Sequence, residues 1–265
     1  MIDVLYIATD SYTEYKDEFF GSFKYFAPGR EKRITVLTNK PEEFDGIELE
    51  DGTPIKVIKM LDLLYPCINL HKSYFIEQLN FDGDYIFYFD ADTKFKSVLN
   101  YAWNALFDAM DNGEVIISKH PVYSLKDGAH LYNWEKQKWI NNFCSANMTE
   151  KDPSRQSYIA KDVYTYVISS FFAASNKTMH TLNELIVKMT RNDLTRSLGY
   201  HIPSFMDENY FNALVSDYED GITNCGLKFS VKQYSQLYGK DEETNYYSEC
   251  FLYQKNFKDY KHNRR

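Results

Sequence analysis

Two aspartates one residue apart end an apolar stretch in the first half of the chain. Residues 85–95 read YIFYFDADTKF, so Asp90 and Asp92 directly follow a run of strand-forming side chains. In an extended backbone, residues two apart point to the same side, and we expect both carboxylates to face one place beyond the strand. Two such anions repel each other unless a cation lies between them, and carboxylate oxygens suit a hard divalent ion. The pair predicts a Mn²⁺ or Mg²⁺ site, with an ordinary surface loop as the alternative.

Two other interpretations of acidic residues in this region are weaker. A second pair, Asp82 and Asp84, surrounds a glycine before the strand and is interpreted as a solvated turn. A calcium-binding loop starting at Asp90 is excluded, because Phe95 stands where that loop needs glycine and Tyr101 where it needs glutamate.

A second carboxylate motif and a basic tail occur later in the chain. Asp207 and Glu208 in the stretch MDEN begin a predicted helix, and helix capping is the alternative explanation for them. The last residues, QKNFKDYKHNRR, concentrate positive charge that would suit an anionic small ligand.

Alternating elements must position these residues. Apolar runs predict strands at 2–8, 33–39, 55–60, 85–89, 114–118 and 164–175. Helical spacing of apolar residues predicts helices at 12–26, 70–80, 98–112, 179–189 and 207–218. Residues 124–163 are polar and lack a clear period, which indicates a long functional loop or lid. The alternation predicts an α/β fold, a mainly parallel sheet flanked by helices.

Composition narrows the class of protein. The chain has 265 residues and a net charge of −8, which argues against binding to nucleic acid or an anionic membrane. Its four cysteines form no CxxC pair, so neither a zinc site nor a disulfide framework is expected. The first residues lack the pattern of a signal peptide, and no apolar run reaches membrane-spanning length. We expect a cytoplasmic protein without a transmembrane segment.

Several stretches together resemble glycosyltransferase family 6, the retaining α-1,3-galactosyl and N-acetylgalactosaminyl transferases. The matching stretches, in the order of the family, are IATDSY, TVLTN, LHKSYF, YIFYFDADTKF, SKHPVY, DPSRQSYIAKD, ISSFFAAS, FMDENYFNAL and QKNFKDYKHN. The resemblance implies a single GT-A, Rossmann-like domain over 1–265. Its expected parts are a nucleotide-binding half at 1–118, an acceptor-binding half at 119–250 and a basic tail at 251–265 that closes over the nucleotide.

The resemblance assigns roles on the donor side. Asp90 and Asp92 match the metal-binding acids that anchor the diphosphate of a UDP-sugar, and Glu208 matches the essential carboxylate. That carboxylate is either a nucleophile or an electrostatic stabiliser of the transition state. The other implied donor-side residues are Ile7, Ala8, Tyr12, Lys255 and Lys261 for the nucleotide, and Asp207, Lys72, Ile168 and Ser170 for the donor sugar.

Some implied positions depart from the family pattern. Lys72 stands where the family usually has arginine, so the charge is kept and the bidentate fork is lost. Ser169 replaces a glycine in the donor-selecting segment. A pocket crowded by the larger side chain predicts a plain hexose as the donor sugar, rather than an N-acetylhexosamine. On the acceptor side the resemblance implies His120, Asn133, Phe205 and Asp241, with Phe205 in place of a tryptophan.

The sequence thus predicts a metal-dependent retaining glycosyltransferase that moves galactose, N-acetylgalactosamine or glucose from UDP to a sugar hydroxyl. One alternative is a haloacid-dehalogenase-like phosphatase, which also places two aspartates one residue apart after a strand. That family needs threonine or valine where this chain has Lys94. The other alternative is a sugar-binding descendant of the fold without activity.

Overall fold

The fold comes from a computed structural model of the whole chain. The structure describes residues 1–63, 67–97, 100–119, 154–158, 167–195, 207–219, 226–232, 238–239 and 252–254. None of the helices in these ranges has the length and apolar character needed to cross a membrane.

A mixed, mostly parallel sheet of seven strands forms the centre, in the order β3-β2-β1-β4-β7-β6-β8. Its strands are β1 Ile2–Ile7, β2 Lys32–Thr38, β3 Ile55–Lys59, β4 Tyr85–Asp90, β6 Glu114–Lys119, β7 Val167–Ser175 and β8 Lys228–Lys232. The strands β3, β2, β1 and β4 run parallel, while β7 is antiparallel to both of its neighbours, β4 and β6. A three-stranded sheet consists of β5 Thr93–Phe95, β10 Leu252–Gln254 and β9 Tyr238–Gly239.

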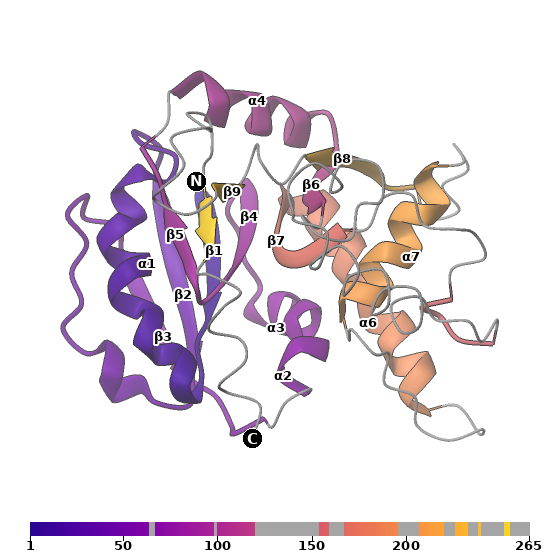
Figure 1. The fold of residues 1–265 in the computed structure, drawn as a ribbon, viewed down its shortest axis with the longest axis horizontal. Helices are drawn as coiled ribbons and strands as arrows, with labels where there is room; N and C mark the ends of the chain where they lie inside the picture. The colour runs from indigo at the N-terminus through magenta and orange to yellow at the C-terminus, as the bar shows by residue number, and fades with distance from the viewer. Residues whose placement is uncertain are drawn as a thin grey trace, which may run out of the picture.

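Helices cover both faces of the main sheet, as the alternating pattern predicts. They are η1 Asp10–Tyr15, α1 Lys16–Ser22, η2 Phe23–Tyr25, η3 Pro41–Phe44, α2 Cys67–Leu70, α3 Lys72–Leu79, α4 Asn100–Asp111, α6 Asn176–Thr195 and α7 Asp207–Glu219. Figure 1 shows α6 and α7 side by side on the right of the central strands and α1 on the left.

Strand β4 divides its side chains between two hydrophobic cores. Phe87 and Phe89 join the core that contains the aromatic residues of α1 and α4. Ile86 and Tyr88 join the core on the other face, together with apolar residues of α3, α6 and α7. This division follows from the two-residue period of a strand, so both faces of β4 are buried.

The predicted strands and helices are confirmed within the described residues, but two aromatic residues at the spacing of an apolar helical stripe are exposed. Tyr12 is 47% exposed and Tyr74 is 41% exposed, although both fit an apolar helical stripe. The segment around Tyr12 is a 3₁₀-helix followed by α1, so the period of an α-helix does not extend through it. In α3, the buried side chains are those of Lys72, Ser73 and Ile76 instead.

The acidic turn before β4 is exposed, as predicted, and it has structural partners. Asp82 forms an ion pair with Arg33, and Asp84 forms one with the N-terminal ammonium group. Arg33 also pairs with the fully buried carboxylate of Asp3. These charges lie at the amino ends of β1 and β4, opposite the ends that carry Asp90.

Candidate active site

The carboxyl ends of β1 and β4 meet the beginning of β7 at one edge of the main sheet. Ile7 pairs with Asp90 across the parallel strands β1 and β4. On the other side of β4, Phe89 pairs with Phe171, so residues 167–170 of β7 extend past the last paired residue of β4. In α/β sheets this kind of edge is where ligands bind.

Three charged side chains from three separate segments contact one another at this edge. The ammonium Nζ of Lys72 lies 3.2 Å from Oδ1 of Asp90 and 3.3 Å from Oδ2 of Asp207. The side chains of Lys72 and Asp207 are only 5% and 6% exposed. The first residue of α3, the last of β4 and the first of α7 are thus joined by a buried cation.

Burial and charge together set the protonation states in this cluster. Burial alone would lower the pKa of Lys72, but the charges of Asp207 and Asp90 outweigh it and hold that pKa well above its usual range. Burial raises the pKa of Asp207, Lys72 opposes the rise, and Asp90 adds to it. The lysine is therefore a permanent cation, and Asp207 takes up a proton more readily than an exposed aspartate.

Tyr88 is a further member of the site that the sequence analysis did not single out. Its hydroxyl donates to Oδ1 of Asp90 at 2.7 Å, and its ring centroid lies 4.8 Å from Nζ of Lys72. Burial, and next the charge of Asp90, raise the pKa of Tyr88 far above its usual range, so it remains a donor. A signal for it existed, since strand alternation places residue 88 on the same side as residue 90.

The two aspartates do not continue one extended strand. The strand β4 ends at Asp90, and residues 91 and 92 form a turn. Burial raises the pKa of Tyr6, and the charge of Asp92 adds a smaller increase. The hydroxyl of Tyr6 donates to the carbonyl oxygen of Ala91 at 3.3 Å. Tyr6 and Tyr88 belong to cores on opposite faces of the sheet. The extended backbone expected for the pair therefore stops at Asp90, so strand alternation does not determine where the side chain of Asp92 points.

The donor set at this edge still fits a hard divalent cation. Among the described residues, both contacts of the Asp90 carboxylate fall on Oδ1. This leaves Oδ2 as its oxygen for a metal ion. The described residues contain no group of three metal-ligating side chains. An ion held by Asp90 and Asp92 would take its remaining ligands from water or phosphate oxygens, as Mg²⁺ commonly does.

The strand β7 brings the backbone of the predicted donor-selecting segment to Glu208. The backbone N–H of Ser169 donates to Oε2 of Glu208 at 3.3 Å, and the side chain of Ser169 hydrogen-bonds to Asp207. The register with β6 shifts here, because Ile117 pairs with Phe172 while the next residue pairs with Ile168. Such bulges are common next to active sites, where they redirect backbone groups. The side chains of Ile168, Ser169 and Ser170 are all buried.

The predicted nucleotide-binding residues of the first strand lie at the same edge. Ile7 ends β1, and the backbone N–H of the buried Ala8 donates to the carbonyl oxygen of Leu37 at 3.0 Å. Tyr12 follows on η1, and its partial exposure gives an aromatic face that a base could contact.

The end of β10 also lies near the paired aspartates. It runs antiparallel to β5, with Gln254 opposite Thr93, the residue after Asp92. The described part of the chain thus ends beside the proposed metal ligands. Six predicted residues lie outside the described residues: His120, Asn133, Phe205, Asp241, Lys255 and Lys261.

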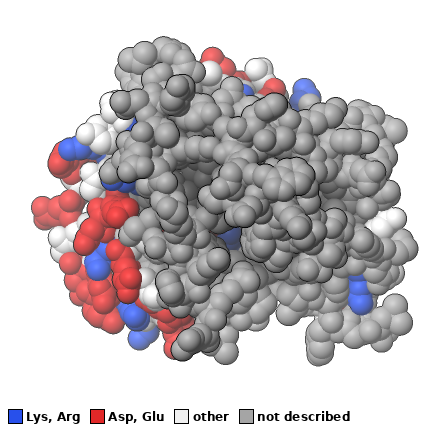
Figure 2. Space-filling view, in the orientation of Figure 1, with Lys and Arg blue, Asp and Glu red and all other residues white. Residues whose placement is uncertain are grey.

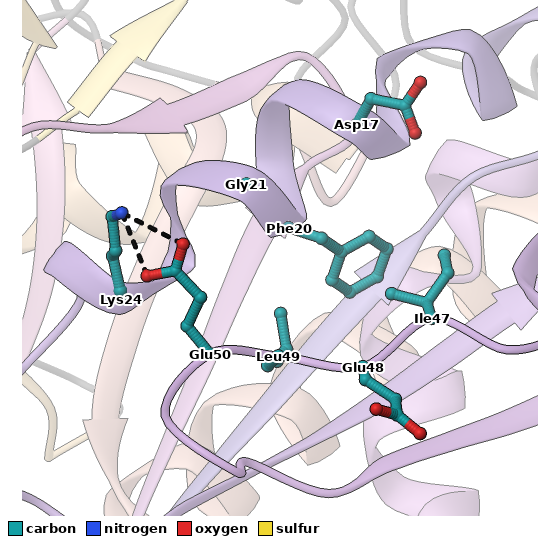
Figure 3. A pocket seen from close by; sticks show the side chains of 8 residues that line it. All are labelled: Asp17, Phe20, Gly21, Lys24, Ile47, Glu48, Leu49 and Glu50. Atoms are coloured by element: carbon teal, nitrogen blue, oxygen red, sulfur yellow. Dashed lines mark hydrogen bonds and ion pairs between the residues drawn. The ribbon is translucent and has the colours of Figure 1, made fainter.

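A hollow of about 280 Å³ elsewhere on the surface shares no residue with this site. Phe20 of α1 faces Ile47 and Leu49 there, and Lys24 pairs with Glu50 at its margin (Figure 3). Acidic side chains gather on the same side of the molecule as α1 (Figure 2). The exposed acids of this region include Glu14, Asp17, Glu18, Glu42, Glu43, Asp45, Glu48, Glu50 and Asp51. Their charge would repel a diphosphate, so the hollow does not compete with the strand edge as the donor site.

Comparison with known proteins gave no match, either to a protein-family model or to a curated protein. The resemblance to glycosyltransferase family 6 therefore depends on the sequence motifs and their order alone.

Proposed function

We propose that this protein is a metal-dependent retaining glycosyltransferase of the GT-A type, which moves a hexose from a UDP-sugar to a sugar hydroxyl. The observation that carries the proposal is the ion cluster of Lys72, Asp90 and Asp207. The resemblance assigns these three residues, from three distant segments, to one donor site. Their contacts at a single strand edge support that assignment, since sequence spacing alone does not require them to meet.

The expected position of the donor follows from the charges at the edge. Asp90 and Asp92 would hold Mn²⁺ or Mg²⁺, and the bound ion would neutralise part of the negative charge of the diphosphate. Tyr12, next to the end of β1, would lie against the uracil. Lys72 adds a buried positive charge beside the sugar and phosphate, and it keeps Asp207 ionised for a hydrogen bond to a sugar hydroxyl.

Glu208 would act at the anomeric carbon. In a retaining transfer, the bond from that carbon to UDP breaks and a bond to the acceptor oxygen forms on the same face, while the proton of the acceptor hydroxyl passes to the departing phosphate of UDP. Glu208 either forms a covalent intermediate from the opposite face or stabilises positive charge on the sugar. Its carboxylate is oriented for this by the backbone N–H of Ser169. The buried Ile168 and Ser170 limit the room beside the sugar, which favours a plain hexose.

Calorimetry with UDP tests the proposal, once with Mn²⁺ and once with a chelator, followed by a hydrolysis screen of UDP-sugars. The proposal expects UDP binding that requires Mn²⁺ and one UDP-sugar that is cleaved fastest. Glu208→Gln should reduce turnover by about 100-fold or more, since it removes a group that acts on the reacting centre. Glu184→Gln on the exposed face of α6 is the matched control and should leave turnover unchanged.

Absence of UDP binding under both conditions would refute the transferase proposal. A phosphatase would instead release phosphate from a generic phosphomonoester without UDP, and Asp90→Asn would abolish that release. A binding protein without activity would retain UDP affinity and show no turnover with any sugar.

A further inference from the structure

The side-chain amide of Asn212 joins α7 to the first residue of β7. Its Oδ1 accepts from the backbone N–H of Val167 at 2.8 Å, and its Nδ2 donates to the carbonyl oxygen of the same residue at 2.9 Å. These two bonds resemble the pairing that a neighbouring strand would offer. They occur where β4 has ended, because β4 pairs only with residues 171–175 of β7. Buried backbone groups require such partners, and Asn212 satisfies those of Val167.

The same amide also holds the backbone of Glu208. Nδ2 of Asn212 donates to the carbonyl oxygen of Glu208 at 2.8 Å, one helical turn earlier. Asn212 is 1% exposed, and its three hydrogen bonds fix the orientation of the amide, because a flipped amide would place nitrogen against the N–H of Val167. Water cannot easily replace these bonds in so buried a place.

Glu208 is therefore attached to β7 at two points. Its carbonyl oxygen connects through Asn212 to Val167, and its carboxylate accepts from the backbone N–H of Ser169, two residues further along the same strand. A displacement of α7 along β7 would break both attachments together.

We propose that Asn212 is a positioning residue that fixes the carboxylate of Glu208 against β7. The effect on turnover rests on the proposed function. The effect on the position of Glu208 is independent of that function, since the backbone N–H of Ser169 is hydrogen-bonded to that carboxylate and its exchange rate measures whether the bond is present. A functional carboxylate that shifts by about 1 Å can lose about 100-fold in rate, so removal of the attachment should act on the chemical step.

Two variants of Asn212 separate the bond to the strand from the bond within the helix. Asn212→Ala removes both. Asn212→Ser keeps a hydroxyl that can bond to the carbonyl oxygen one turn earlier, and it loses the bridge to Val167. Asn183→Ala is the matched control, because Asn183 is equally buried on α6 and donates to the carbonyl oxygen of Met179 at 2.9 Å without a described bond to a strand.

The first measurement is amide hydrogen exchange in the wild type and the three variants. In both Asn212 variants, the amides of Val167 and Ser169 should exchange at least about tenfold faster than in the wild type. Asn183→Ala should leave both rates unchanged. If the Ser169 amide keeps its protection in Asn212→Ser, the carboxylate of Glu208 has not moved and the proposal is overturned.

The second measurement is the hydrolysis of the preferred UDP-sugar. For both Asn212 variants, kcat should fall by about tenfold to 100-fold while the donor KM changes by less than about threefold. A kcat within about twofold of that of Asn183→Ala would overturn the proposal. If the wild type cleaves no UDP-sugar, the proposed function fails, and the exchange rates decide the role of Asn212 by themselves. If Asn212→Ala does not fold, Asn212→Ser provides both measurements.

Discussion

Replacement of Lys72 by methionine should destabilise the protein in a manner that depends on pH. The substitution keeps the length of the side chain and removes the ammonium group that faces Asp207 and Asp90. The carboxylate of Asp90 is 31% exposed and remains partly hydrated, so most of the cost falls on the buried Asp207.

The size of the cost has an upper limit, because Asp207 can take up a proton instead of remaining charged. An aspartate with the ordinary pKa of 3.8 costs about 4 kcal/mol to protonate at pH 7, at about 1.4 kcal/mol per pH unit. Removal of one partner from a buried ion pair usually costs about 3–5 kcal/mol. The two figures agree on a loss of about 3–4 kcal/mol at pH 7, a large part of the stability of a typical domain.

The sign of the pH dependence follows from the same group. Without Lys72, the pKa of Asp207 in the folded state rises further above 3.8, so the folded state binds its proton more tightly than the unfolded state does. The variant therefore loses stability as the pH rises above 3.8, and its deficit relative to the wild type shrinks as the pH falls from 7 toward 4.

Urea denaturation at pH 7, 6 and 5 measures this deficit. Asp207→Asn added to Lys72→Met should recover most of the loss at pH 7, because no buried charge then remains at residue 207. Lys24→Met is the control, since Lys24 pairs with the exposed Glu50 at 2.9 Å and its removal should leave the denaturation midpoint unchanged. A deficit below about 1 kcal/mol at pH 7, or one that does not change between pH 7 and 5, would refute the argument.

Three further substitutions test particular contacts. Gly83→Ala should lower the melting temperature, because an ideal Cβ would lie 2.7 Å from Oδ2 of Asp3, and overpacking of this kind costs about 1–3 kcal/mol; an unchanged melting curve would contradict it. Tyr88→Phe should cost about 2 kcal/mol through the lost bond to Asp90, whereas the exposed Tyr25→Phe should cost nothing measurable in the same urea titration. Asp90→Asn should weaken Mn²⁺-dependent UDP binding by at least about tenfold in calorimetry, and equal affinity would exclude Asp90 as a metal ligand.

The sequence predicted more of the fold than of the site geometry. The continuous apolar run along 85–89 was sufficient to place a strand with both faces buried, since successive side chains of a strand point to opposite faces. The helical stripe of α7 was equally clear from Tyr210, Phe211 and Leu214. Asn212 lies outside that stripe, so the helical spacing gave no indication that its polar side chain is buried.

Local patterns failed where the outcome depends on distant partners. Tyr74 fits an apolar stripe, yet it is exposed, while the charged Lys72 two residues before it is buried. A charged lysine is buried only when opposite charges offset the free-energy cost of removing its ammonium group from water. Those charges come from β4 and α7. No pattern within α3 contains that information.

The sequence by itself determined the elements and the side chains available for chemistry: a pair of aspartates, a second carboxylate motif and an α/β alternation. These follow from local sterics and side-chain type. Only the tertiary structure decided that Asp90 shares its carboxylate with Lys72 and Tyr88, that a turn separates it from Asp92, and that Asn212 connects Glu208 to β7. Hydrogen bonds and ion pairs between distant segments form only when the whole sheet has brought their backbones to one edge.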